Sequence, residues 1–216
     1  QKVYAEPGGS ESNQAADASK DDSNKKEEKK EEDMTPEERE KKAEEDAYKM
    51  EIQSNGWKNW PKGPGTYGEA AIVMDAGTGS ILYAKNIHQK EYPASTTKIL
   101  TTLIASERCS MDEIVDFSYD AVHDIDPGSN HIAIEPGEQL TMEECLNAIL
   151  IRSANEVSFA VAEHISGTTW QDFGDIMNER AKELGCVDSH FVNPNGLPNE
   201  EHYTSAYAVS YTHLRA

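Results

Sequence analysis

The sequence predicts an α+β domain in which helices pack against an antiparallel sheet. Two short apolar runs, 70–74 and 81–84, flank a loop that contains glycine, and this pattern predicts a β-hairpin. Several stretches with apolar residues at helical spacing follow the hairpin. We therefore expect the hairpin to form the first strands of the sheet and the first of these helices to pack on it.

Start and stop signals delimit the helices in the second half of the chain. Thr141 and Glu144 have the spacing of a capping box, which opens a helix that we expect to end near Arg152. A further apolar helix ends at Gly167. The last predicted helix covers 170–184 and has one apolar stripe. These helices are expected to supply most of the core.

The helix after the hairpin begins with two polar residues of catalytic type. Ser95 and Lys98 are three residues apart, so their side chains share one helix face. Pro93 precedes them and apolar residues follow, which places Ser95 at a helix N-terminus that favours negative charge. A nucleophilic serine needs a base, and Lys98 can serve if its pKa falls from about 10.4 to roughly 7–8. The alternative is a capping serine beside a solvated lysine.

A second motif makes the catalytic interpretation stronger. Ser153-Ala154-Asn155 is the only Ser-x-Asn in the chain and lies between two apolar helical stretches. Ser-x-x-Lys followed by Ser-x-Asn is typical of penicillin-binding proteins and class A β-lactamases. Further motifs occur in this order along the chain: Thr78-Gly79, Pro93 to Lys98, Gly137-Glu138, Ser153 to Glu156, Asn193-Pro194-Asn195-Gly196-Leu197 and His202-Tyr203-Thr204-Ser205-Ala206. Together they resemble the serine D-alanyl-D-alanine carboxypeptidases, the low-molecular-mass penicillin-binding proteins, over about 69–207.

The resemblance implies a fold and a role for each motif residue. The fold would be α+β, an α/β sandwich of the β-lactamase and transpeptidase type, with a helical cluster on an antiparallel sheet. Ser95 would be the acyl-ester nucleophile, Lys98 the general base, Ser153 a proton shuttle, and Asn155 would orient the substrate and Lys98. The family's third motif, Lys-Thr-Gly, does not occur in this sequence. We therefore expect the sheet to lack its downstream strands and the 216 residues alone to be inactive.

The resemblance also implies the partners. The substrate would be a peptidoglycan stem peptide ending in D-Ala-D-Ala, from which the terminal D-alanine is removed, and β-lactam antibiotics would be covalent inhibitors. No cofactor and no metal are expected, and Cys109, Cys145 and Cys186 show no ligand spacing and are interpreted as buried thiols. Two alternatives remain open: a β-lactamase, which needs a deacylating base, and a non-catalytic protein that binds the wall or senses β-lactams.

The amino-acid composition of the N-terminal part differs from that of the rest of the chain. The formal net charge is -20, and residues 1–50 hold 10 Lys and Arg against 16 Asp and Glu, which argues against a nucleic-acid partner. Residues 1–5 resemble the end of a secretory signal, 6–65 a disordered, charged, low-complexity spacer, and 66–207 the N-terminal portion of the catalytic domain. Residues 208–216 lack an amphipathic face and are interpreted as an atypical end, a truncation artefact.

The predicted location is outside the cytoplasm, in a bacterial cell envelope. The resemblance implies it, because this chemistry acts on the cell wall, and residues 1–5 are consistent with secretion. The sequence contains no run of 18 apolar residues, so no membrane span is expected. Membrane anchoring would therefore require sequence beyond the C-terminus given, and both a secreted and an anchored protein are compatible with the chain.

Overall fold

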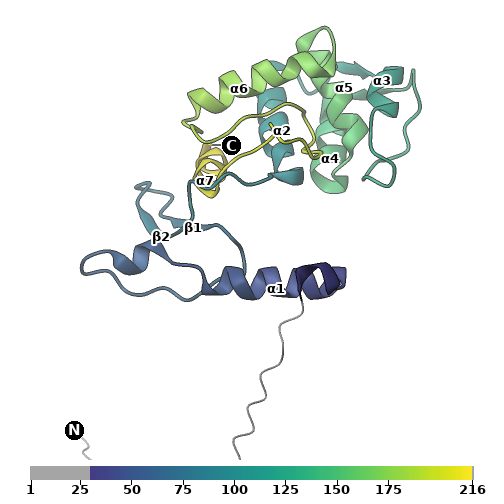
Figure 1. Ribbon diagram of the computed structural model, residues 1–216. Coiled ribbons are helices and arrows are strands. Elements are labelled where there is room, and N and C mark those ends of the chain that lie inside the picture. Colours follow the sequence, from purple (N-terminus) through teal and green to yellow (C-terminus); the bar gives the residue numbers. More distant parts are fainter. Residues whose placement is uncertain (1–29, 216) are drawn as a thin grey trace, which may run out of the picture. The chain divides into compact units, whose positions relative to one another are not determined.

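The computed structural model describes residues 30–215, in two units that comprise Gln1–Arg39 and Glu40–Ala216 (Figure 1). The described part of the first unit has a 3-10 turn, Glu31–Asp33, and the start of helix α1, Pro36–Lys49. Thr35 caps this helix: its hydroxyl accepts from the Glu38 backbone N–H at 3.2 Å. The predicted residues 1–5, and the spacer as far as residue 29, lie outside the described residues.

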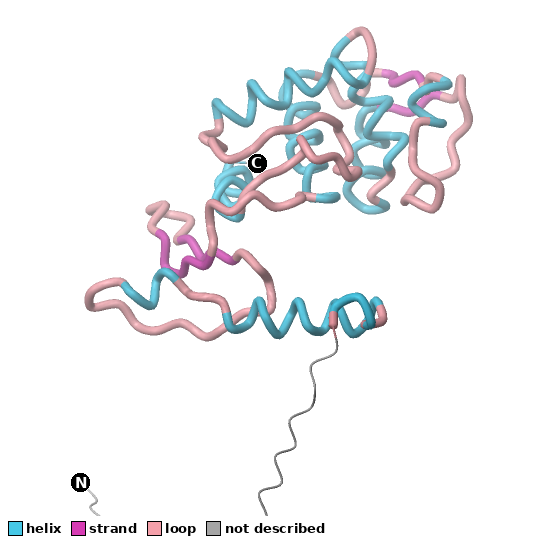
Figure 2. The backbone as a smooth tube through the Cα atoms, in the orientation of Figure 1, coloured by secondary structure: helices cyan, strands magenta, loops and turns pink. Residues whose placement is uncertain are grey.

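The second unit combines many helices with two small antiparallel sheets, as Figure 2 shows in cyan and magenta. The strands are β1 (Ala71–Met74), β2 (Ile81–Lys85), β3 (Ile114–Asp116) and β4 (Gln139–Thr141). The α-helices are α2 (Thr97–Arg108), α3 (Tyr119–His123), α4 (Met142–Arg152), α5 (Asn155–Ser166), α6 (Phe173–Glu183) and α7 (Ala206–Arg215). Short 3-10 turns cover Gln53–Gly56, Ala94–Thr96 and Trp170–Asp172. This architecture confirms the predicted α+β class.

Strands β1 and β2 form the predicted hairpin. Ala71 pairs with Lys85 and Val73 with Tyr83, and a bulge follows Val73. The Asp75 carboxylate closes the loop by accepting from the Thr78 backbone N–H at 2.8 Å. The hairpin therefore depends on local turn chemistry, as the sequence indicates.

Helix α2, which follows Ser95, lies among other helices. It packs mainly against α4, α5 and α6 (Figure 1), while the helix with the most contact to β1 is α7. Leu100, Leu103 and Ile104 belong to one buried cluster with α6 side chains, and Ala105 belongs to a second cluster with α4 and α5. The prediction that this helix packs on the hairpin is therefore wrong, because α2 is apolar on the sides that face its helical neighbours.

The second sheet was not predicted. Strands β3 and β4 pair antiparallel over three residues each, with Val115 opposite Leu140. Val115 is fully buried, whereas Ile114 is exposed. Strands this short contain too few residues for an alternating pattern to stand out against turns.

The end of the chain also differs from expectation. Residues predicted to be an atypical end continue helix α7, Ala206–Arg215. The Ser205 hydroxyl accepts from the Ala208 backbone N–H at 3.1 Å, and Ala208 is buried in the cluster around α2 and α6. Among the described side chains of α7, the buried one is the small residue Ala208. A single alanine does not produce a strong apolar stripe in the sequence.

Part of the predicted spacer is ordered. Lys85 is fully buried, and its ammonium donates to the carbonyls of Ala47, Thr66 and Gly68 at 2.6, 2.9 and 2.7 Å. A buried ammonium needs such acceptors, so these contacts hold 47–68 against the hairpin. The predicted boundary at residue 66 remains a prediction.

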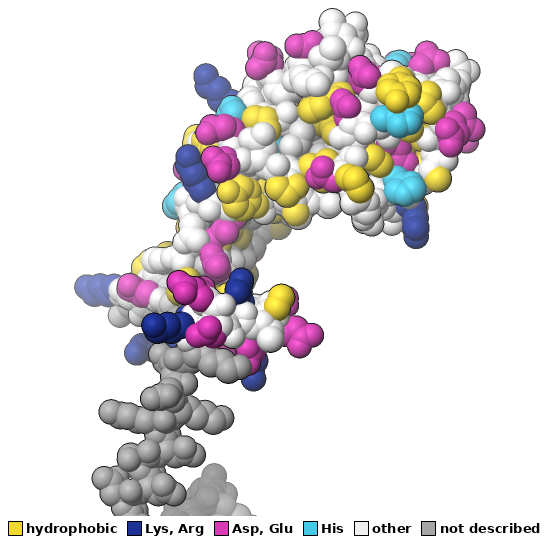
Figure 3. Space-filling model, turned by 45° about the vertical axis from the view of Figure 1, so that its right-hand side comes forward, with side chains coloured by type: hydrophobic (Ala, Val, Ile, Leu, Met, Phe, Trp, Pro, Cys, Tyr) yellow, Lys and Arg dark blue, Asp and Glu magenta, His cyan; other side chains and the backbone are white. Residues whose placement is uncertain are grey.

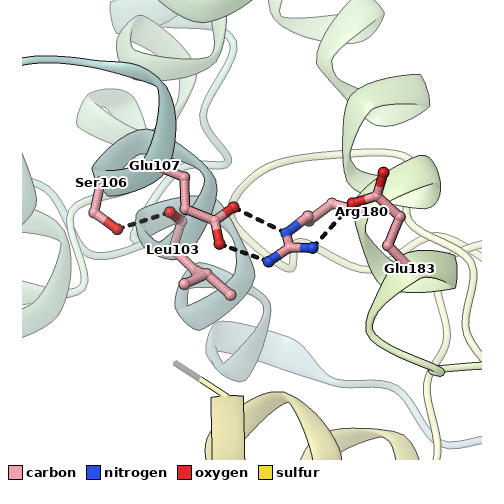
Figure 4. A network of polar contacts seen from close by, with 5 residues as sticks. All are labelled: Leu103, Ser106, Glu107, Arg180 and Glu183. Carbon is pink, nitrogen blue, oxygen red and sulfur yellow. Dashed lines mark hydrogen bonds and ion pairs between the residues drawn. The ribbon is translucent and has the colours of Figure 1, made fainter.

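An ion pair joins α2 to α6 at the surface (Figure 4). The Arg180 guanidinium donates to both carboxylate oxygens of Glu107, at 2.9 and 2.6 Å, and to Glu183 at 2.9 Å. The Arg180 side chain is 26% exposed, so screening limits the contribution of this pair to about 1 kcal/mol or less.

The surface of the described residues mixes acidic and apolar side chains. Figure 3 shows both kinds interspersed on the face in view. Exposed large apolar residues include Val73 and Leu82 of the hairpin and Leu150 and Ile151 of α4. Within residues 30–215, none of the helices has the length and apolar character needed to cross a membrane.

Candidate active site

Ser95 lies in a sharp turn in front of α2. The 3-10 turn Ala94–Thr96 leads directly into the helix, and Ala94 has a positive φ of 47°. This conformation is uncommon for a residue other than glycine, and such backbone is concentrated at functional sites. Ser95 is exposed, so its hydroxyl is open to a ligand.

Lys98 lies one turn further into the helix and is only 2% exposed. Its Nζ donates to three oxygens: Ser95 Oγ at 3.3 Å, Asn155 Oδ1 at 2.8 Å and the Asn195 carbonyl at 2.7 Å. Burial lowers the pKa of Lys98 to about 8, although the negative charge of Glu156 acts in the opposite direction. The amine is therefore buried and partly neutral near neutral pH, and the alternative of a solvated lysine does not hold.

The Ser-x-Asn motif meets this pair at the junction of α4 and α5. Ser153 ends α4 in a left-handed conformation, with φ of 55°, and its Oγ is 3.0 Å from Ser95 Oγ. Asn155 is buried at the start of α5 and donates from Nδ2 to the Asn130 carbonyl at 3.1 Å. All four residues predicted from the sequence, Ser95, Lys98, Ser153 and Asn155, thus converge.

The loop 193–197, to which the sequence alone gives no role, supplies part of the site. The Asn195 carbonyl accepts from Lys98, and the loop packs tightly on the turn before Ser95. A Cβ on Gly196, which has φ of +86°, would lie 1.8 Å from the Ala94 carbonyl oxygen. Only glycine fits there. The motif that contains Asn195 and Gly196 was visible in the sequence, but its contact with Ala94 was not.

His202 contacts Thr97, the first residue of α2, next to the turn that carries Ser95. Its Nε2 lies 2.8 Å from the Thr97 hydroxyl, and its Nδ1 accepts from the Val192 backbone N–H at 3.1 Å. Nδ1 is thus the acceptor nitrogen, and the imidazole is neutral. Burial, followed by the charge of His190, lowers the pKa of His202 to about 4.

Glu156 anchors the loop that crosses the start of α5. It is 1% exposed, and its Oε1 accepts from the Ile132 backbone N–H at 2.6 Å. Together with the bonds from Asn155 to the Asn130 carbonyl, this contact holds residues 130–132 beside the site. In the sequence, Glu156 stands out only as part of a motif.

The arrangement suits a nucleophilic serine with a lysine base. A neutral amine has two hydrogens and one lone pair. If Asn155 Oδ1 and the Asn195 carbonyl take the hydrogens, the lone pair faces the Ser95 hydroxyl. The Ser153 hydroxyl donates to Ser95 Oγ at 3.0 Å, so a proton can pass between the two hydroxyls. A cavity of about 170 Å³ lined by Tyr92, Pro93, Ala94, Gly196, Leu197, Pro198 and His202 adjoins this turn.

A serine and a lysine on one helix turn, faced by a Ser-x-Asn turn, are typical of the acyl-transferring penicillin-binding class. The family model described as D-alanyl-D-alanine carboxypeptidase (peptidase S11) matches residues 59–215. The chain therefore belongs to this family.

Relatives and solved structures agree with this membership. The chain is 41% identical over 144 residues to D-alanyl-D-alanine carboxypeptidase DacF of Bacillus subtilis, with 66% of this chain and 37% of that protein covered. The crystal structure of DacD from Francisella tularensis has a TM-score of 0.63 at 34% identity, covering 68% of this chain and 36% of that one. Penicillin binding protein 6B from Escherichia coli has a TM-score of 0.65 at 29% identity, covering 73% and 52%. The chain thus spans well under two thirds of these relatives.

Proposed function

We propose that the protein is a serine-type D-alanyl-D-alanine carboxypeptidase that removes the terminal D-alanine from peptidoglycan stem peptides. The observation that carries this proposal is the position of Lys98, a buried amine with a lowered pKa, 3.3 Å from an exposed serine hydroxyl. Family membership and the names of the relatives support this choice of substrate.

The proposed first half-reaction forms an acyl-enzyme. Ser95 Oγ attacks the carbonyl carbon between the two D-alanines while neutral Lys98 takes the hydroxyl proton. The backbone N–H of Ser95, at the helix N-terminus, is the proposed donor to the oxygen that becomes negative. The C–N bond then breaks, and the D-alanine amine leaves with the proton held by Lys98, passed through Ser153.

The proposed second half-reaction releases the shortened peptide. Water attacks the ester carbonyl on Ser95 and transfers a proton to Lys98, and Ser95 leaves as a hydroxyl after taking that proton back. Asn155 accepts from Lys98 through Oδ1 throughout and so fixes the direction of its lone pair. A β-lactam would acylate Ser95 in the same way, and the relative named penicillin binding protein 6B supports this part of the proposal.

The proposed location is the bacterial cell envelope, outside the cytoplasm, where peptidoglycan is accessible. The family is defined by a reaction on cell-wall peptides, which supports this location. Both a secreted and a membrane-anchored protein fit the proposal.

The test compares Ser95→Ala with Ser106→Ala in the whole protein. Ser106 lies on α2, the helix that follows Ser95, and its hydroxyl donates to the Leu103 carbonyl at 2.8 Å, which makes it a matched control. We expect wild type and S106A to release D-alanine from a D-Ala-D-Ala peptide and to bind fluorescent penicillin covalently. S95A should do neither.

Two outcomes would count against the proposal. Covalent labelling of S95A by penicillin would remove Ser95 as the nucleophile. Rapid release of the bound penicillin, with no release of D-alanine, would favour a β-lactamase instead.

A further inference from the structure

Three side chains with metal-ligand chemistry meet at the C-terminal ends of two helices. Cys109 follows the last residue of α2, His164 lies in the last turn of α5, and Glu113 directly precedes β3. One ligand atom from each of the three lies within 4.8 Å of the others. Thiolate, imidazole and carboxylate are the ligand types that zinc accepts in proteins. This cluster lies outside the candidate active site.

The backbone and neighbouring groups orient these ligands. Glu113 Oε1 accepts from the Ser110 backbone N–H at 2.6 Å, and its carbonyl accepts from the Met142 N–H at 2.8 Å. The other carboxylate oxygen, Oε2, lies 2.9 Å from His164 Nε2. Cys109 packs against the buried cluster that includes α4 and α5 side chains. One oxygen of the carboxylate is therefore held by the backbone, while the second lies against the imidazole.

The electrostatics around Cys109, Glu113 and His164 favour a bound cation. Both α2 and α5 point their C-terminal ends, which carry partial negative charge, toward the cluster. A divalent ion binds Cys109 as the thiolate, because a coordinated thiol loses its proton. Arg108 is the opposing positive charge at this end of the helix.

The distances are compatible with coordination after small side-chain rotations. With bond lengths of about 2.0–2.3 Å, the ligand atoms around a tetrahedral zinc ion lie about 3.3–3.7 Å apart. The separations of up to 4.8 Å in the cluster need to shrink by roughly 1 Å, and the 2.9 Å contact needs to open slightly. The side chains of His164 and Glu113 are 25% and 42% exposed, so an ion can reach them from solvent.

We propose that Cys109, Glu113 and His164 form a zinc site that joins the C-terminal ends of α2 and α5 to β3. The ion forms one bond to each residue and keeps water in its fourth position, and the Cys109 proton is released to solvent. The opposite ends of the same two helices carry Ser95 with Lys98, and Asn155. The site is therefore a structural clamp on the two helices that present the candidate active site, and it does not depend on the proposed reaction.

Cobalt provides the spectroscopic test, because a thiolate bound to Co²⁺ gives a charge-transfer absorption that carboxylates do not. The reduced, metal-free protein is titrated with Co²⁺ and then with Zn²⁺. We expect one Co²⁺ per chain with a thiolate band, displaced by zinc. C109S should lose the band, and H164A should weaken binding at least tenfold.

Cys186→Ala and His123→Ala are the matched controls. Cys186 is a buried cysteine outside the cluster, whose Sγ donates to the Ala208 carbonyl at 3.5 Å, and His123 is a histidine on α3. Both variants should keep the band. A band that survives C109S, or no thiolate band in the wild type, overturns the proposal and leaves only an ion pair beside a free thiol.

A second measurement needs no variant. Cys109 is half-buried, whereas Cys145 and Cys186 are buried, so a thiol-alkylating reagent should modify Cys109 first. Saturating Zn²⁺ should slow the modification of Cys109 at least tenfold, as read by peptide mass spectrometry. An unchanged rate of alkylation at Cys109 contradicts the site even where C109S fails to fold.

Discussion

Lys98 Nζ donates a 2.8 Å hydrogen bond to Oδ1 of Asn155, a residue 57 positions further along the chain. Lys98 also donates to the Asn195 carbonyl and the Ser95 hydroxyl, which are uncharged as well. Neutral acceptors satisfy the buried amine without holding its proton as strongly as a carboxylate partner would. This combination keeps Lys98 buried and hydrogen-bonded and still leaves it able to act as a base.

The first prediction concerns the pH dependence of acylation. Because the pKa of Lys98 is lowered to about 8, the neutral fraction rises as the pH increases toward that value. The second-order rate of acylation by a penicillin should therefore rise about tenfold per pH unit between pH 6 and 7 and level off above pH 8. Lys98→Arg should abolish the reaction, because a guanidinium keeps its proton. Equal rates at pH 6 and pH 8.5 would exclude Lys98 as the base.

The second prediction concerns Asn155. Asn155→Ala removes one of the three acceptors of Lys98 and the side-chain donor to the Asn130 carbonyl. A lost hydrogen bond to a charged group costs about 1.5–3 kcal/mol, so acylation should slow about ten- to a hundredfold. Asn147→Ala is the control, because Asn147 is exposed on α4 and bonds to the Glu143 carbonyl. Labelling of N155A at the wild-type rate would show that the contact with Lys98 is dispensable.

The third prediction separates backbone strain from steric overlap at a glycine. Gly196 and Gly128 have nearly equal φ, +86° and +85°, but a Cβ on Gly128 would meet no atom within 4 Å. Gly128→Ala should therefore lower the free energy of unfolding by only about 1–2 kcal/mol. Gly196→Ala adds an overlap with the Ala94 carbonyl, for roughly 1–3 kcal/mol more.

Urea unfolding of both variants measures these costs, and penicillin labelling reports on the site. G196A should also acylate more slowly, because the displaced loop carries the Asn195 carbonyl that accepts from Lys98. If G196A and G128A lose the same stability and label equally fast, the close approach of Gly196 to Ala94 has no energetic importance.

The fourth prediction concerns stability at mildly acidic pH. The pKa of His202 is about 4 in the folded protein, below its ordinary value of 6.5. The unfolded chain therefore binds a proton at this residue at a higher pH than the folded protein does. The stabilisation is fully present above pH 6.5 and decreases as the pH falls toward 4, in total by about 3 kcal/mol.

Urea unfolding at pH 7, 6 and 5 tests this pH dependence. The wild type should lose stability across the range, and His202→Gln should be less stable at pH 7 but show a flatter profile. His123→Gln is the control, because His123 lies at the surface and its Nδ1 contacts the Tyr119 carbonyl of the same helix. Parallel profiles for the wild type and H202Q would contradict a neutral, buried His202.

Local sequence signals predicted the helix boundaries well. Thr141 and Glu144 form the capping box, and Gly167 ends α5 with φ of 70°. Gly185, just after α6, also has positive φ. These features depend on residues within one turn of each other, so the sequence displays them directly.

Contacts between distant segments could not be predicted in the same way. Strands β3 and β4 are three residues long, and the buried residue of helix α7 is Ala208. None of these three elements therefore has a strong periodic pattern in the sequence. The packing of α2 among helices depends on partners in α4, α5 and α6, which lie far later in the chain. Local pattern identifies an apolar face but does not identify what covers it.

The spacing of Ser95 with Lys98, and of Ser153 with Asn155, was readable from the chain alone, because each pair is local. The burial that lowers the pKa of Lys98 and the carbonyl that Asn195 supplies became visible only once the segments were packed together. The same holds for the meeting of Cys109, Glu113 and His164. A side chain's desolvation and its distant neighbours depend on how helices and loops enclose it, and neither is a property of adjacent residues.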